Sequence, residues 1–344
     1  MITTLQRLYI ILINHEWQAK ILNHFIVFPF MSIIDFISMA LFIATIIYIS
    51  LKQIETFKIK LLVSMPFIIL IFLFSRSFVL LPIYIYSLIA ATYLYTIFFY
   101  IPFAIDFILI LISSLDHMAT LKLLLISISV PMLMSMFLDK NMKKYGLENE
   151  EHKGKDIKRE SYRDYFQIGT GIITILVFVF FGHFGKVIIL YSVLLIYLFG
   201  NILYLHKDYR ITNLVYRMER ENTKLGLGSM YLASGFLLVM GFIGSIRVLY
   251  VAAFLIMVGD SLATIIGMRL RTPRLVYNNK KSVGGFLAMC IPSFIFGVFF
   301  IFYVPAIFYS VFATFAESIS NKIADDNITI PVSIIIAHFI LAVA

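Results

Sequence analysis

Charged residues are scarce in this chain, and their scarcity excludes a soluble globular domain. Only 14% of the 344 residues are Asp, Glu, Lys or Arg, whereas 61% are hydrophobic. A typical soluble domain carries about 25% charged and 45–50% apolar residues. The composition therefore predicts an integral membrane protein.

Cysteine is almost absent as well. The single residue, Cys290, excludes an intramolecular disulfide. The start of the chain lacks a small-residue cleavage pattern, so we expect no signal peptide there. The net charge of +9 comes from Lys and Arg in short loops between apolar runs. That distribution is typical of cytoplasmic loops, and we expect no nucleic-acid partner.

Apolar runs, by contrast, recur along almost the whole chain. A helix needs about 20 apolar residues to cross the hydrocarbon core of a bilayer. The runs predict an all-α, polytopic membrane protein with about twelve transmembrane helices. The predicted segments are 21–50, 60–75, 77–99, 101–115, 119–138, 165–181, 186–205, 230–246, 248–268, 285–303, 305–320 and 328–344.

The longest polar stretch, residues 139–164, divides the chain into two halves. We interpret 1–138 as a multi-span region of unknown role, 139–164 as a polar cytoplasmic linker and 165–344 as a second multi-span domain. Two further basic stretches, 206–224 and 269–281, are each separated from the preceding one by two predicted spans. All three therefore fall on one face, which the excess of Lys and Arg predicts to be cytoplasmic.

Asp260 is the first candidate functional residue, because an acid within a membrane helix is costly unless it is hydrated, paired or bound to a metal. A water-bound aspartate at a helix end is the alternative. Gly259, Ala263 and Gly267 form a stripe of small residues, which allows close approach of either a ligand or another helix. Thr264 lies one turn after Asp260, so carboxylate and hydroxyl are expected on the same side.

Basic residues precede two of the predicted spans on the same face. Lys280, Lys281 and Ser282 stand just before Gly284 and Gly285, and Lys224 precedes another glycine-containing helix entry. Backbone amides at a helix N-terminus favour anions, and lysines add positive charge. The pattern indicates a phosphate-binding site, with an ordinary basic loop and glycine cap as the alternative.

Acidic residues cluster before the last predicted span. Glu317 lies near a helix end, and Asp325 and Asp326 are adjacent to each other. Neighbouring carboxylates repel unless a cation is close, which indicates either Mg²⁺ or one of the lysines. A solvated acidic turn that caps the helix is the alternative. Two more acids, Asp35 and Asp106, lie within the first half and either line a pocket or form hydrogen bonds at helix ends and between helices.

Three blocks carry a resemblance to a known family. GDSLATIIGMRL at 259–270, followed by NKKSVGG at 279–285, resembles the GD…A…G…KS…G block of the CTP-dependent polyprenol kinases. That group includes dolichol kinases, phytol kinases and the CTP-dependent diacylglycerol kinase. ESIS…DDNITIP at 317–331 resembles its downstream block, in which Asn327 follows the acidic pair, and 219–235 is similar to its intermediate block. The resemblance covers roughly residues 158–344.

The resemblance implies that CTP donates its γ-phosphoryl group to a long-chain isoprenoid alcohol in the bilayer, with Mg²⁺ as cofactor and CDP released. It implies a catalytic and metal-binding role for Asp260, with Asp325 and Asp326 assisting the metal. Phosphate contacts are assigned to the residues of the basic blocks: Lys280, Lys281, Ser282, Gly284, Lys224, Gly259 and Gly267. Supplementary roles fall to Glu317, Asn327, Thr264 and Arg163.

The sequence departs from the family at one position and leaves alternatives open. The family commonly has E-x-R-R-K-x-x-H, whereas here Glu160, Arg163 and Asp164 are followed by Gln167 where histidine would fall. A cytidylyltransferase would use similar metal and phosphate groups on a lipid phosphate. A multi-span transporter could use intramembrane acids to bind its substrate. Diacylglycerol is a possible acceptor, and the oligomeric state is not indicated.

Overall fold

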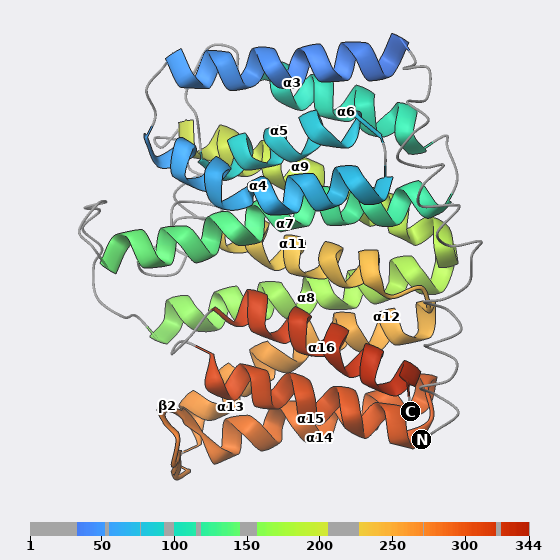
Figure 1. Ribbon diagram of the computed structural model, residues 1–344. Coiled ribbons are helices and arrows are strands. Elements are labelled where there is room, and N and C mark those ends of the chain that lie inside the picture. The colour runs from blue at the N-terminus through green and yellow to red at the C-terminus, as the bar shows by residue number, and fades with distance from the viewer. Residues whose placement is uncertain are drawn as a thin grey trace, which may run out of the picture.

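The protein is a stack of helices that run roughly side by side, as a computed structural model shows (Figure 1). The structure describes residues 33–51, 55–75, 77–92, 100–114, 118–144, 157–205, 227–270, 272–320 and 325–343. The first-half helices are α3 (Ile33–Leu51), α4 (Glu55–Ser75), α5 (Leu80–Thr92), α6 (Tyr100–Ser114) and α7 (Met118–Lys144). The second half contains α8 (Ile157–Phe181), α9 (Gly185–Leu205), α11 (Leu227–Phe242), α12 (Ile246–Ala253), α13 (Asp260–Arg269), α14 (Val283–Phe300), α15 (Tyr303–Ile319) and α16 (Asp326–Val343).

The all-α prediction is confirmed, with one small addition. Two short antiparallel strands, β1 (Arg274–Leu275) and β2 (Asn278–Ser282), form a hairpin between α13 and α14. The hairpin lies at one end of the stack (Figure 1). The sequence had predicted only a basic loop in this position.

Helices of membrane-spanning length and composition are present, but the predicted number of about twelve spans is not confirmed. Within the described residues, seven stretches are long and apolar enough to cross a membrane: Ile33–Leu51, Glu55–Ser75, Leu121–Asp139, Ser161–Leu203, Ile246–Arg269, Val283–Phe300 and Asp326–Val343. Shorter apolar helices include α5, α11 and α15. The fold is compatible with a multi-pass membrane protein.

Two non-α segments shape the second half. The 3-10 turn η1 (Gly182–Phe184) separates α8 from α9, and its Gly182 has a φ of +54°, a conformation that side chains disfavour. The π-helical stretch η2 (Phe254–Gly259) joins α12 to α13 and ends immediately before Asp260. Single-turn π-helices are rare and frequently occur at functional sites.

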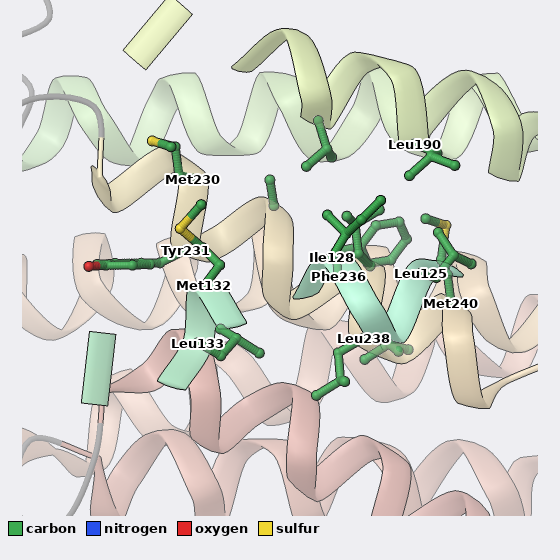
Figure 2. Packing of buried hydrophobic residues seen from close by; sticks show 14 of the residues in the cluster. Leu125, Ile128, Met132, Leu133, Leu190, Met230, Tyr231, Phe236, Leu238 and Met240 are labelled. Atoms are coloured by element: carbon green, nitrogen blue, oxygen red, sulfur yellow. The ribbon is translucent and has the colours of Figure 1, made fainter. Parts of the chain in front are cut away.

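The hydrophobic core joins the two halves. α7 packs extensively on α11, and a single cluster of buried residues runs from α5 and α7 into α9 and α11. Figure 2 shows Leu125 and Ile128 of α7 beside Phe236 of α11 and near Leu190 of α9. The polar stretch 139–164 therefore divides the chain, but it does not divide the core.

Large apolar side chains remain exposed on the outer helices. Leu62 of α4, Phe180 of α8 and Phe299 of α14 are each more than 70% exposed. Contiguous exposed apolar surface is unusual for a soluble monomer and normal for helices that face lipid. These faces agree with the membrane character read from the composition.

Candidate functional site

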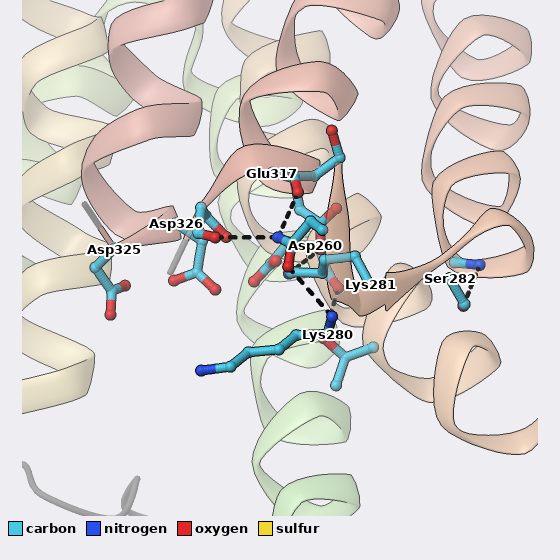
Figure 3. A network of polar contacts seen from close by, with 12 residues as sticks. Asp260, Lys280, Lys281, Ser282, Glu317, Asp325 and Asp326 are labelled. Atoms are coloured by element: carbon cyan, nitrogen blue, oxygen red, sulfur yellow. Dashed lines mark hydrogen bonds and ion pairs between the residues drawn. The ribbon is translucent and has the colours of Figure 1, made fainter. Parts of the chain in front are cut away.

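A half-buried lysine and three buried acids gather at the end of the stack that carries the β-hairpin (Figure 3). The lysine is Lys281 of β2. The acids come from three different helices: Asp260 from α13, Glu317 from α15 and Asp326 from α16. All three acids are at most 5% exposed. The sequence named each of these residues, and the structure brings them together.

Lys281 forms an ion pair with Glu317 at the centre of this group. Burial lowers the pKa of the Lys281 ammonium, but the carboxylates of Glu317, Asp326 and Asp260 raise it, and the net result is a raised pKa. Lys281 is therefore a permanent cation at neutral pH. Its charge holds together acids that would otherwise repel one another.

Asp260 is held from the side by α8. The side-chain amide of Gln167 donates to Asp260 Oδ2 at 3.2 Å and to the carbonyl of Ile256 at 3.2 Å. Gln167 is 8% exposed, so the contact is buried. A hydrogen bond of this kind fixes the orientation of the carboxylate.

Docking of the β-hairpin against α15 determines where Lys281 lies. The side-chain amide of Asn278 donates to the carbonyl of Ser318 at 2.7 Å, and the hydroxyl of Tyr277 lies 2.8 Å from that of Ser318. Lys281 pairs with Glu317 of α15, whereas Lys280 is exposed. The contacts with α15, rather than strand alternation, therefore place Lys281 beside the acids, because the buried Asn278 and the exposed Lys280 share one strand face.

The structure separates the members of the predicted phosphate cradle: Lys281 lies beside the acids, whereas Ser282 and Gly284 have other partners. Ser282 caps α14, because its hydroxyl accepts from the amide of Gly285 at 3.1 Å. The amide of Gly284 already donates to the hydroxyl of Thr272 at 3.0 Å. In Figure 3 Ser282 points away from the Lys281 group. Both amides would have to exchange partners before they could bind a phosphate.

The small-residue stripe of α13 serves helix packing. A Cβ at Gly267 would meet the hydroxyl of Ser282 at 3.1 Å, and one at Gly259 would meet the hydroxyl of Ser293 at 3.0 Å. Both neighbours belong to α14 or its cap. The stripe of small residues therefore allows α13 and α14 to pack closely. The hydroxyl of Thr264 donates back to the carbonyl of Asp260 at 3.2 Å.

The adjacent acids Asp325 and Asp326 have different surroundings. Asp325 is half-buried; its Oδ1 accepts from the amide of Asn327 at 3.2 Å, and its carbonyl accepts from the amide of Thr329 at 3.0 Å. It therefore caps α16, as the alternative interpretation held. Asp326 is buried, and its carboxylate raises the pKa of Lys281. Figure 3 shows Asp325 apart from the other acids.

A magnesium site built from protein alone does not fit the described residues. They contain no group of three or more His, Cys, Asp or Glu side chains that could hold a metal ion. Nucleotide-binding sites, however, commonly hold Mg²⁺ with one or two carboxylates plus substrate phosphates and water. Asp260 and Asp326 fit that second arrangement, with nucleotide phosphates completing the shell.

Two other predicted residues lie outside this group or outside the described residues. Arg163 of α8 pairs with its neighbour Asp164, with 3.1 Å between Nη2 and Oδ1, and Asp164 is 1% exposed. Lys224, with the whole basic stretch 206–224, lies outside the described residues. The structure adds Gln167 and Asn278 to the site.

Comparison with known proteins yields a related sequence without an assigned activity. No protein-family model matches the chain, and no solved structure matches it significantly. Among curated proteins, an uncharacterised protein of Methanocaldococcus jannaschii is 35% identical over 132 residues. The match covers 37% of this chain and 66% of the relative, so the chain spans just under two thirds of that protein.

Proposed function

We propose that this protein is a CTP-dependent kinase of a long-chain isoprenoid alcohol, such as a dolichol or polyprenol, in a cellular membrane. The proposal counts α8 and α9 within Ser161–Leu203 as two spans and adds membrane crossing by the shorter helices α5, α6, α11 and α15, which gives about twelve spans. The end that carries Lys281 would face the cytoplasm, where CTP is available. The proposal rests on the resemblance of three sequence blocks and on one structural observation.

That observation is the gathering of Asp260, Glu317 and Asp326 around Lys281 at one end of an apolar helix stack. Phosphoryl transfer depends chiefly on positioning and on neutralising the charge of the transferred group. A lipid alcohol can present its hydroxyl at the end of a membrane helix, and a water-soluble nucleotide can reach the same level from outside. Charged side chains are therefore gathered where the two substrates would meet.

In the proposed reaction, the oxygen of the lipid hydroxyl forms a bond to the γ-phosphorus of CTP. The bond from that phosphorus to the β,γ-bridging oxygen breaks, and CDP leaves with the bond's electron pair. Asp260, oriented by Gln167, accepts the hydroxyl proton or holds the cation. Lys281 neutralises phosphate charge and keeps Glu317 and Asp326 in place. Mg²⁺, when bound with the nucleotide, would supply charge neutralisation at its phosphates.

The test is a transfer assay with the purified full-length protein in detergent and Mg²⁺. CTP labelled at the γ- or the α-phosphate is offered with a panel of isoprenoid alcohols, diacylglycerol and phosphatidic acid. We expect γ-label in the lipid phosphate with an isoprenoid alcohol, and none of the α-label. ATP in place of CTP tests the choice of nucleotide.

Two aspartates provide matched variants. Asp260→Asn should abolish transfer while the protein still inserts and folds, whereas Asp325→Asn should retain most activity because its carboxylate caps α16. Incorporation of α-label into a lipid phosphate would replace the kinase with a cytidylyltransferase. Absence of labelled lipid with every acceptor, or near-normal turnover of Asp260→Asn, would refute the proposal.

A further inference from the structure

A second acidic site lies far from Lys281, within the first half of the chain. Asp106 stands near the middle of the 15-residue helix α6 and is 2% exposed. Its Oδ1 has no hydrogen-bond partner in the described part of the chain. A carboxylate buried at this depth without a partner is unfavourable, and intramembrane acids commonly mark ion or substrate sites.

Other mid-helix polar groups surround Asp106. The carboxylate of Asp106 interacts electrostatically with the hydroxyls of Tyr86 on α5 and Tyr197 on α9. Tyr197 also shares a short hydrogen bond, 2.5 Å, with the hydroxyl of Ser234 on α11. These four residues come from four helices, and each stands near the middle of its own helix. The hydrogen bond between Tyr197 and Ser234 brings α9 and α11 together at this level.

Asn201 adds an acceptor oxygen to this region. Its side-chain nitrogen donates to the carbonyl of Tyr197 at 2.8 Å and to that of Ala90 on α5 at 3.3 Å. With the nitrogen so engaged, Asn201 Oδ1 is buried without a donor in the described residues. Two buried acceptor oxygens, those of Asp106 and Asn201, thus lack the donors or cation that burial demands.

No basic side chain of these four helices can supply the missing charge. Among the described residues of α5, α6, α9 and α11, the single basic side chain is that of Lys186. It lies about 16 Å along α9 from Tyr197 at the rise of an α-helix, and it donates to the carbonyl of Ile243. The described ionisable groups of neighbouring α3, α4 and α7 stand toward helix ends: Asp35, Glu55, Lys58, Lys60, Lys122 and Asp139.

We propose that Asp106, Asn201 and the hydroxyls of Tyr86 and Tyr197 form an intramembrane site for a monovalent cation, either a proton or Na⁺. All of its donors are oxygen atoms, which suit hard cations. A single carboxylate balances a single positive charge, so a divalent ion would leave excess charge in an apolar environment. This site is separate from the proposed phosphoryl transfer. It is shared between the halves of the chain, since Asp106 and Tyr86 come from the first half and Tyr197 and Asn201 from the second.

The experiment measures thermal unfolding of the full-length protein in detergent, followed by circular dichroism. NaCl is compared with choline chloride at equal ionic strength, at mildly acidic and mildly alkaline pH. A ligand that binds the folded state raises Tm with its concentration. The same samples are examined by infrared spectroscopy for a protonated carboxyl band. Asp106→Asn tests the assignment, and Asp35→Asn is the control because Asp35 is half-buried near the start of α3.

A Tm that rises with Na⁺ at alkaline pH in the wild type and in Asp35→Asn, but not in Asp106→Asn, identifies Na⁺ as the occupant. A protonated carboxyl band that persists at alkaline pH without Na⁺, and disappears in Asp106→Asn, identifies a proton. If Asp106→Asn does not fold, Asp106→Glu replaces it: the wild-type Na⁺ series still reports the metal ion, and a protonated carboxyl band that shifts in Asp106→Glu still belongs to this residue. A wild-type protein with neither response overturns the proposal, whatever its kinase activity.

Discussion

At the scale of single residues, the neighbours Lys280 and Lys281 differ more than their sequence suggests. Lys281 is 18% exposed and pairs with a glutamate that is 3% exposed, whereas Lys280 is exposed at the surface of the hairpin. Removing one partner of a buried ion pair leaves an uncompensated charge, which costs about 3–5 kcal/mol. The two lysines should therefore respond very differently to the same substitution.

We predict that Lys281→Met destabilises the protein and abolishes transfer, whereas Lys280→Met changes both only slightly. The double variant Lys281→Met/Glu317→Leu should regain stability, because it removes both charges, but it should remain inactive. Thermal unfolding and the CTP transfer assay measure the two effects. Activity in the double variant would show that Lys281 holds the fold but does not contact phosphate.

The raised pKa of Lys281 also determines how its contribution to stability depends on pH. Because the carboxylates raise the pKa of Lys281 above that of free lysine, its stabilising contribution is complete below the pKa of free lysine. It is lost only as pH rises through the still higher value of the folded protein. Ionisation of Lys281 should therefore leave stability unchanged from neutral to mildly alkaline pH.

Gln167 offers a second prediction at this scale. Its loss removes a hydrogen bond to the Asp260 carboxylate, and a bond to a charged group contributes about 1.5–3 kcal/mol. We expect Gln167→Ala to lower kcat tenfold or more with a smaller change in KM. Thr170→Ala is the control, because its hydroxyl bonds to the carbonyl of Phe166 on the exposed face of α8. Equal losses in both variants would contradict a positioning role for Gln167.

These residues also show which parts of the candidate site could be predicted from the sequence. Asp260, Lys281, Glu317 and Asp326 could be named in advance, because acids and lysines at the ends of apolar runs are conspicuous. The contact between Gln167 and Asp260 joins positions 93 residues apart and has no local signal. The departure from the family pattern at Gln167 even argued against a role there.

At the scale of elements, the β-hairpin was missed because its strands are short and polar. The run LVYNNKKS has no apolar alternation that would indicate a half-buried strand. Its stability comes instead from hydrogen bonds to the end of α15, which the sequence does not reveal. The π-helical stretch η2 was likewise not predicted, since a π-turn inside an apolar run leaves the hydrophobic pattern unchanged.

The hairpin gives an element-scale prediction. Asn278 is 2% exposed and donates to the carbonyls of Ser318 and Ser320, at 2.7 and 3.4 Å. Asn278→Ala should leave these carbonyls without their donor, free the hairpin from α15 and displace Lys281 from Glu317. We expect transfer to fall strongly, with Tm lowered by a few degrees. Asn279→Ala, at the adjacent exposed position, should behave like the wild type in both assays.

At the scale of the whole molecule, the side chain of Asp139 connects an ion pair between α4 and α7 to α11 of the second half. Lys60 of α4 lies 2.6 Å from Asp139 of α7, and Asp139 also accepts from the hydroxyl of Tyr231 on α11 at 3.2 Å. One turn further along α11, a Cβ at Gly235 would lie 2.6 Å from the carbonyl of Asn327 at the start of α16. The first half is thus connected through α11 to the helix that positions Asp326.

We predict that Lys60→Met lowers the Tm of the entire protein, because it leaves the half-buried carboxylate of Asp139 without its cation. Lys58→Met is the matched control, since Lys58 is exposed on the same helix. Lys60→Met/Asp139→Leu should restore much of the lost stability, as replacement of a buried pair by apolar residues often does. Circular dichroism in detergent measures all four proteins.

The shape of the unfolding curve distinguishes a shared core from two independent domains. Because α7 packs on α11 within a continuous buried cluster, the two halves should unfold together, and Lys60→Met should shift a single transition. If 1–138 were an independent module, the substitution would lower one transition and leave a second in place. A single shifted transition, with transfer activity lost at the same temperature, would mean that the first half is part of the structure that holds Asp326. Two transitions would show that the contact between α7 and α11 does not couple the halves.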